Sequence, residues 1–136
     1  MKYNYEINSE NQTIIVKTIG DIITKEIVAM GLEIMMIAKE LNCKIVYDYR
    51  LSNRISVDEA YNWFSTHYEN IDCEFRRIPT AYIVNIDDWE FYSFFECTSN
   101  NKGITIKAFQ DENDCLRWLK IYENLKTVNA LCKIMF

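Results

Sequence analysis

The residues with the clearest chemical potential follow a short apolar run, Ile45 to Tyr47. Asp48 and Arg50 come directly after this run and carry opposite charges two positions apart. A buried strand of an open α/β sheet that ends at this point places its loop where such folds bind ligands. The two residues can bind a polar ligand or a protein partner, or the acid can bond only the N–H groups of its own loop. The second interpretation is favoured, because single residues rarely define a site.

Two serines in the following segment are candidates for modification. Ser56, with Glu59 three residues later, forms a capping-box pattern, in which the serine hydroxyl accepts a backbone N–H of the first helical turn. A phosphate there would be stabilised by the free N–H groups and the helix dipole. Capping explains Ser56 without a kinase, so phosphorylation of Ser52 or Ser56 is the less favoured interpretation.

A third candidate is an unusually aromatic helix, expected from Asp87 or Asp88 to about Ser99. Its apolar side chains cover more of the circumference than one buried stripe requires, and the candidate binding residues are Trp89, Phe91, Tyr92 and Phe95. They can cover an apolar pocket or contact a partner or a second copy. The favoured alternative is that a small aromatic-rich domain buries all of them in its core.

Metal and catalytic chemistry find little support in the sequence. It has one histidine, His67, and five dispersed cysteines with no Cys-x-x-Cys pair. A zinc site of the usual spacing is therefore not expected, and His67 is more typical of a structural or solvent-edge residue. Paired carboxylates, a glycine-rich phosphate loop and a nucleophile elbow are not visible. We expect no metal, no cofactor and no catalytic activity.

The composition narrows the class of protein further. The 136 residues suffice for one domain with a core, and 49% hydrophobic and 14% aromatic residues exclude global disorder. A formal net charge of −5 disfavours nucleic acid as a partner. No uncharged apolar run approaches the length of a membrane span, and the first residues lack the apolar core of a signal peptide. The sequence predicts a cytoplasmic protein with reduced thiols.

The elements that position these residues begin with a hairpin. Residues 2–7 alternate between polar and apolar types, which predicts a half-buried strand. Thr13 to Ile19 is a second β-rich run, so the two strands are expected to pair antiparallel. Thr24 is a candidate cap for the helix that follows, whose apolar stripe runs to Leu41.

The rest of the chain alternates strands and helices. The predicted strands are Ile45–Tyr47, Thr80–Ile86 and Ile104–Phe109. The helix that begins at Ser56 is expected to bury a face made by Val57, Ala60, Tyr61, Phe64 and Tyr68. Asp111 is expected to cap a last helix. The order β-β-α-β-α-β-α-β-α predicts a single-domain α/β fold with a mixed, mostly parallel sheet of about five strands, four helices and right-handed connections.

The expected domain covers residues 1–122, and a helical C-terminal extension covers residues 123–136. Its apolar spacing is set by Ile121, Leu125, Val128, Cys132 and Met135. This stripe can pack back on its own domain or form the seam of a homodimer, which is the commonest oligomeric state.

The layout of residues 3–120 resembles the STAS-like group, named for anti-sigma factor antagonists, in the branch grouped with CRAL-TRIO lipid carriers. The resemblance rests on four segments: Thr13 to Gly20 before a long helix, the strand ending at Asp48, Ala81–Val84 before Trp89, and Phe109-Gln110-Asp111 leading to Trp118-Leu119. In the antagonists a phosphorylated serine follows the strand-end aspartate that Asp48 matches. Here the loop lacks the family's glycine, and that serine has no clear counterpart.

Two functions follow from the residues and the resemblance. The first is a non-catalytic interaction or regulatory module that binds a protein partner or self-associates, with an exposed patch near Asp48 and the aromatic helix. The alternative is a carrier or sensor of a small apolar ligand such as a lipid. The alternative predicts a cavity of at least ~300 Å³ lined by Phe and Tyr side chains.

Overall fold

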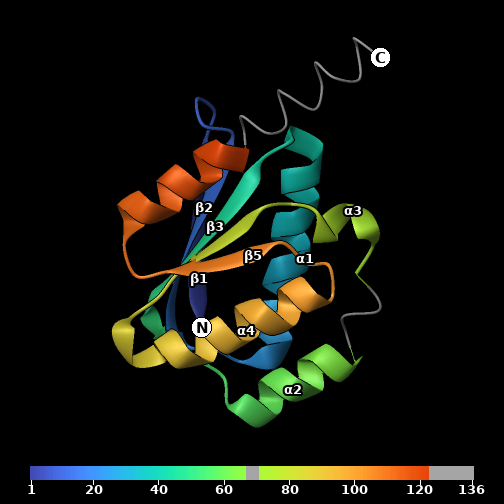
Figure 1. Cartoon of the computed structure of the whole chain (residues 1–136), viewed down its shortest axis with the longest axis vertical. Coiled ribbons are helices and arrows are strands. Elements are labelled where there is room, and N and C mark those ends of the chain that lie inside the picture. Colours follow the sequence, from blue (N-terminus) through green and yellow to red (C-terminus); the bar gives the residue numbers. More distant parts are fainter. Residues whose placement is uncertain (67–70, 123–136) are drawn as a thin grey trace.

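The computed structural model describes residues 1–66 and 71–122. Its core is a five-stranded sheet in which the spatial order equals the chain order (Figure 1). The strands are β1 (Lys2–Asn8), β2 (Thr13–Asp21), β3 (Lys44–Asn53), β4 (Thr80–Ile83) and β5 (Ile106–Phe109). β1 pairs antiparallel with β2, and all later pairs are parallel. The predicted mixed, mostly parallel sheet is confirmed.

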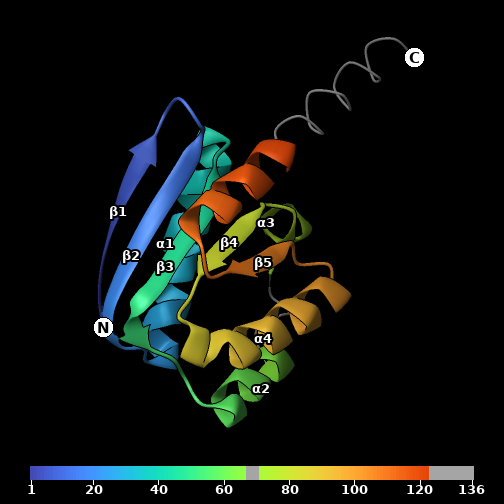
Figure 2. The same cartoon turned by 60° about the vertical axis from the view of Figure 1, so that its left-hand side comes forward.

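Helices cover both faces of this sheet (Figure 2). The described helices are α1 (Thr24–Leu41), α2 (Val57–Thr66), α3 (Cys73–Arg76), the 3₁₀ turn η2 (Ile86–Asp88), α4 (Trp89–Asn101) and a last helix over residues 112–122. The four longer helices were predicted, whereas α3 and η2 were not. None of the helices in the described ranges is long and apolar enough to cross a bilayer.

Two apolar clusters hold the layers together, one on each face of the sheet. The larger cluster joins β2 and β3 to α1 and α4 through residues such as Ile14, Ile34 and Ile45. The smaller cluster joins Val46 of β3 to Cys115 of the last helix. Because successive side chains of a strand point to opposite faces, Ile45 and Val46 enter different clusters.

The central strand β3 is longer than the sequence indicated. It continues past Tyr47 to Asn53, because β2 keeps pairing with it through Lys17 to Asp48 and, after a bulge, through Ile19 to Leu51. Asp48 therefore lies within the strand, at the point where pairing with β4 ends. The expectation that the strand ends at Asp48 was wrong. The apolar run Ile45–Tyr47 marks the part of the strand that is buried on both faces, but the strand itself continues as far as β2 pairs with it.

Residues 2–7 form a strand as predicted, but the prediction that one face of this strand is buried was wrong. All seven residues of β1 are exposed, and Tyr3, Tyr5 and Ile7 keep 38–45% of their surface accessible. β1 is an edge strand, and the helices that cover the sheet do not bury it. The alternation of polar and apolar residues shows that the two faces of β1 differ chemically, but both faces are exposed.

The helix starts confirm two of the predicted caps. Ser56 Oγ accepts the backbone N–H of Glu59 at 3.2 Å, and Asp111 Oδ1 accepts that of Asn113 at 2.7 Å. α1 instead has Ile23 at its N-cap position and no side-chain cap, so the proposed role of Thr24 was wrong. Asp88 occupies the N-cap position of α4 without a capping hydrogen bond.

The second helix is rotated relative to the predicted face. Ala60 and Phe64 are buried, but Val57 and Tyr61 are 56% and 68% exposed. Trp63, which the pattern did not select, packs against the larger cluster instead. Tyr68 and His67 lie outside the described residues, as does the predicted extension over 123–136.

The packing of α1 generates a stability prediction. Ile34 is fully buried in this helix, whereas Met36 two positions later is 65% exposed. Ile34→Ala should lower the free energy of unfolding by about 2–5 kcal/mol, because the substitution removes apolar contacts and leaves a cavity. Met36→Ala should change it by less than about 0.5 kcal/mol. Urea denaturation of both variants measures the difference, and equal effects would contradict the arrangement of α1.

Candidate functional site

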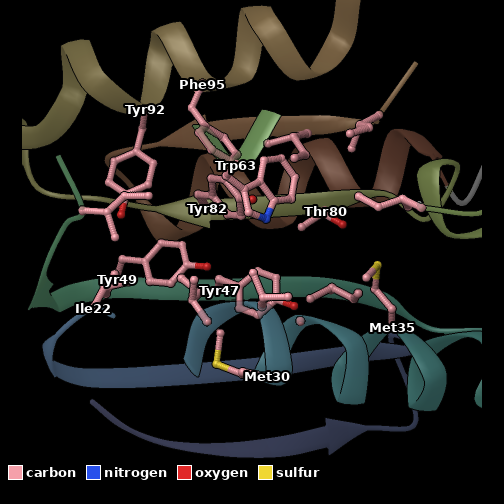
Figure 3. Close-up of a pocket in the computed structure, with 18 of the residues that line it drawn as sticks. Ile22, Met30, Met35, Tyr47, Tyr49, Trp63, Thr80, Tyr82, Tyr92 and Phe95 are labelled. Atoms are coloured by element: carbon pink, nitrogen blue, oxygen red, sulfur yellow. The ribbon is translucent and has the colours of Figure 1, made fainter. Parts of the chain in front are cut away.

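An apolar cavity of about 230 Å³ lies between α1, α4 and the face of the sheet that carries Tyr47 and Tyr49 (Figure 3). Its floor comes from alternate residues of β3, namely Ile45, Tyr47 and Tyr49, and from Tyr82 of β4. These residues share one face because the side chains of a strand alternate with a period of two. The parallel pairing of Tyr47 with Tyr82 sets the two strands in register at the cavity.

The walls are two helices that stand apart above this floor. Residues of α1, including Met30 and Met35, form one wall, and Phe91, Tyr92 and Phe95 of α4 form the other. Figure 3 shows Tyr92 and Phe95 reaching from α4 toward the tyrosines of β3. The predicted aromatic helix thus contributes three of its four candidate residues to the cavity. Trp89 packs against the core but does not line the cavity.

Trp63 of α2 lines another side of the cavity, together with Ile71 and Phe75. Trp63 is held by aromatic contacts, with ring centroids 4.9 Å from Phe64 and 5.7 Å from Phe95. These contacts attach α2 to α4 and place the indole against the cavity (Figure 3).

A glycine in the middle of α1 also borders the cavity. Gly31 lies four residues from Ile27 and Met35, which line the same space. A Cβ added at Gly31 would meet no atom within 4 Å. A glycine inside a helix is less favourable than alanine by roughly 1 kcal/mol. Close packing does not explain this glycine, so its effect is to leave the space beside α1 open.

Four tyrosine rings form a contiguous aromatic group. Tyr49 is the centre of the group and stacks on Tyr47 and Tyr92, each with ring centroids 5.6 Å apart and interplanar angles of 3° and 10°. Tyr82 meets Tyr49 edge to face at 5.2 Å. Such offset and edge contacts contribute about 0.5–1.5 kcal/mol per pair beyond area burial. The rings therefore hold the cavity floor in a fixed arrangement.

The hydroxyls of these four tyrosines have no hydrogen-bond partner among the residues that the structure describes. In this part of the chain, Ser99 Oγ is the one fully enclosed side-chain oxygen or nitrogen without a partner, so the tyrosine oxygens border accessible space. Burial raises the pKa of Tyr47, Tyr49, Tyr82 and Tyr92 above the usual tyrosine value. All four stay protonated at neutral pH and can donate a hydrogen bond into the cavity.

Within residues 1–66 and 71–122, the cavity lining contains no acidic, lysine or arginine side chain. Arg54 does not line the cavity, but its guanidinium lies 4.5 Å from the ring centroid of Phe91, which does. Arg54 also forms an ion pair with Asp88, with Nε and Oδ1 3.6 Å apart. The interior of the site is therefore apolar, with hydroxyl donors as its polar groups.

Asp48 and Arg50 lie away from the cavity, since their positions in β3 alternate with those of Tyr47 and Tyr49. Arg50 donates from Nε and Nη2 to the two carboxylate oxygens at 3.0 and 2.8 Å, and its backbone N–H donates at 3.1 Å. Burial raises the pKa of Asp48, but these hydrogen bonds outweigh it and the pKa lies below its usual value. The two side chains satisfy each other, and their binding of a partner stays a prediction.

The two candidate serines have different environments. Ser52 is buried, and its Oγ lies 2.6 Å from Thr18 Oγ1. Ser56 is exposed and caps α2. The hydroxyl of Ser56 is accessible to a modifying enzyme in the folded protein, whereas that of Ser52 is not. Phosphorylation of either residue stays a prediction.

Sequence reasoning missed most of the cavity. Tyr47, Tyr49 and Tyr82 were assigned to strands or passed over, and Trp63 was not placed on the buried face of its helix. The alternation of Tyr47 and Tyr49 was an available signal, because it directs two aromatic rings to one face of a central strand. The expected cavity under the aromatic helix is present, but at about 230 Å³ it is smaller than the predicted ~300 Å³.

Metal binding has no structural support in the described ranges. Over residues 1–66 and 71–122, no group of three or more His, Cys, Asp or Glu side chains is arranged to hold an ion. His67 falls in the gap between these ranges.

No protein-family model matches the sequence, and no curated protein matches it. The structure is similar to the crystal structure of an uncharacterized protein of the DUF3478 family from Shewanella loihica PV-4, described as having a SpoIIAA-like fold. The TM-score is 0.55 and the sequence identity 15%, and the match covers 87% of this chain and 92% of that chain. The fold is therefore SpoIIAA-like, which confirms the resemblance to the STAS-like group at the level of the fold. The relation to the CRAL-TRIO branch stays a prediction.

The buried tyrosines generate a pH prediction. In the unfolded chain they ionise near pH ~10, whereas burial holds their protons to higher pH in the native state. Their contribution to stability is fully present below this pH and is lost as the pH rises toward the native pKa. The free energy of unfolding should fall above pH ~10, by about 1.4 kcal/mol per pH unit for each tyrosine that stays protonated.

Urea denaturation at a series of alkaline pH values measures this slope. The double variant Tyr49→Phe/Tyr82→Phe keeps both rings and removes two ionisable groups, so its slope should be about 2.7 kcal/mol per pH unit shallower. An equal slope in the native protein and the double variant would contradict the assigned burial of the two hydroxyls.

Proposed function

We propose that the protein is a non-catalytic binding module that takes a small, predominantly apolar ligand into the cavity between α1, α4 and the sheet, as a carrier or sensor. The observation that carries the proposal is an apolar cavity bordered by tyrosine hydroxyls and by a helical glycine. The SpoIIAA-like fold supports a regulatory or carrier role, and the described lining of the cavity consists of apolar, tyrosine, tryptophan and threonine side chains with one glycine.

The energetics of packing favour a site over a packing defect. Protein interiors are close-packed and contain few voids larger than a water molecule. At ~24 cal/mol per Å³, an enclosed space of about 230 Å³ forgoes contacts of about 5.5 kcal/mol, which is an upper bound for a pocket partly open to solvent. That is a large fraction of the stability of a typical domain. A ligand that fills the space restores these contacts.

The size of the cavity limits the ligand. Pockets for drug-sized ligands have volumes of ~300–1,000 Å³, and this one has about 230 Å³. A compact molecule fits, whereas a long lipid chain does not fit inside. The proposed ligand is therefore smaller than the lipid that the sequence suggested.

The described cysteines support a reducing compartment for this function. Cys43, Cys73, Cys97 and Cys115 are free thiols, and Cys43 and Cys115 are buried. Free thiols of this kind are typical of cytoplasmic proteins. Cytoplasmic location is part of the proposal.

Gly31 provides the test of the cavity. Gly31→Leu should fill part of the space and remove a helical glycine, so we expect it to raise the free energy of unfolding by about 1 kcal/mol. Naphthalene at ten times its Kd should stabilise the native protein by about 1.4 kcal/mol, which is a rise in melting temperature of roughly 4 °C. The rise should disappear in Gly31→Leu.

Ala29→Leu is the matched control, because Ala29 lies in the same helix but is exposed and does not line the cavity. This variant should keep the response to naphthalene. A response that persists in Gly31→Leu would place the binding elsewhere, and no response in the native protein would contradict the proposed function. Native mass spectrometry of gently purified protein then reports the mass of any resident ligand.

A second candidate function, self-association, is favoured by the edge strand β1. Tyr3, Tyr5 and Ile7 are exposed on one face of β1, and no described strand other than β2 pairs with it. An edge strand with exposed apolar side chains offers free backbone groups to a second chain. A homodimer formed through β1 agrees with the interaction module that the sequence predicted.

Tyr5→Lys tests this candidate. If β1 forms the dimer contact, a charge on the edge strand should convert a dimer to a monomer in light scattering coupled to size exclusion. Tyr61→Lys on α2 is the matched control, because Tyr61 is also exposed and lies outside the sheet. A native protein that is monomeric at all accessible concentrations, or a dimer that Tyr5→Lys leaves intact, would contradict the role of β1.

A further inference from the structure

We propose that the ligand of the cavity is an uncharged, flat aromatic molecule of about two fused rings that carries a hydrogen-bond acceptor. This inference rests on the proposed function and names the chemical class that the site selects. It follows from the volume of the cavity, the charge of its lining, its hydrogen-bond donors and the arrangement of its rings.

The volume sets the number of rings. An apolar cavity of ~150 Å³ in another protein accommodates benzene. The cavity here has about 230 Å³, half as large again, which corresponds to a bicyclic molecule.

The charge of the lining excludes an ionised ligand. Among the described residues, no acidic, lysine or arginine side chain borders the cavity, and Arg54 near its edge already pairs with Asp88. Moving an unpaired charge into such a site costs several kcal/mol, because the interior cannot replace its hydration. A neutral molecule enters without this penalty.

Every polar side chain of the described lining carries a proton to donate, and the tyrosine and threonine hydroxyls can also accept. The hydroxyls of Tyr47, Tyr49, Tyr82 and Tyr92 lack partners among the described residues, and the indole nitrogen of Trp63 can only donate. The hydroxyl of Thr80, which also lines the cavity, donates to the carbonyl of Ile78 at 3.0 Å. A ligand that brings an acceptor satisfies an unpaired donor, whereas a purely apolar ligand leaves all of them unpaired.

The arrangement of the rings favours a flat ligand. Tyr47, Tyr49 and Tyr92 are nearly parallel, and Tyr82 stands at 61° to Tyr49. Such a group presents ring edges and ring faces to one space, and aromatic molecules pair favourably with both. A flat aromatic ligand can extend this pattern.

Naphthalene and quinoline form the decisive probe pair, because they have the same shape and quinoline adds one ring nitrogen that accepts a hydrogen bond. The ratio of their dissociation constants, measured by calorimetry, gives the contribution of this acceptor to binding. The preference for quinoline over naphthalene, expressed as the ratio of the two dissociation constants, should be about five times larger in the native protein than in Tyr49→Phe/Tyr82→Phe. Naphthalene affinity should be unchanged or higher in that variant.

The variant keeps both aromatic rings, so the packing of the floor is retained, and its circular dichroism and melting temperature verify that it folds. The single variants Tyr47→Phe and Tyr92→Phe then locate the acceptor if it bonds a different hydroxyl. A ratio that is the same in the native protein and in all the phenylalanine variants would overturn this inference while leaving naphthalene binding, and therefore the proposed function, intact.

Two charged analogues test the second part of the inference. 2-Naphthoate and N-methylquinolinium should bind at least about a hundredfold more weakly than quinoline at neutral pH. Comparable binding of either ion would overturn the requirement for a neutral ligand. Failure of all four probes to bind would remove the proposed function together with this inference.

Discussion

The pairing of β3 between β2 and β4 is the constraint on which the rest of the molecule depends. Because side chains alternate along the strand, this register sends Ile45, Tyr47 and Tyr49 into the cavity, while Asp48 and Arg50 are absent from its lining. A slip of one residue would exchange the two sets and place an ion pair in the apolar layer. The tyrosine floor and the separate Asp48–Arg50 pair are thus two results of the same strand pairing.

The cavity exists because α1 and α4 cover the same face of the sheet at a distance from each other. Trp63 lines the space between them, and its ring contacts with Phe64 and Phe95 hold it there. The floor is stiffened by the stack around Tyr49, and each of its rings keeps no more than 8% of its surface exposed. Rigid aromatic side chains with two rotatable bonds lose little conformational entropy when a ligand binds, which suits a preformed site.

Local chemical signals predicted most of the fold. Ser56 and Asp111 were identified as caps from their own sequence neighbourhoods, and the run Ile45–Tyr47 identified a central strand. The error at Asp48 arose because strand length depends on how far β2 continues beside β3. The cavity was harder to predict, since a void is the space left between residues distant in sequence, such as Gly31, Tyr82 and Phe95. The aromatic helix indicated where such a space can lie, but not its size or its tyrosine floor.

Two features at the cavity are individually unfavourable for folding, and they occur at the same place. Gly31 weakens α1 because glycine is a poor helix former. The hydroxyls of Tyr49 and Tyr82 border the cavity and have no protein partner among the described residues. Alanine and phenylalanine would relieve these penalties without changing the backbone. Penalties of this kind are expected where a protein keeps a binding site, because the groups that recognise a ligand stay unsatisfied until the ligand binds. A single bound molecule that fills the space beside Gly31 and accepts a hydrogen bond from a tyrosine offsets both.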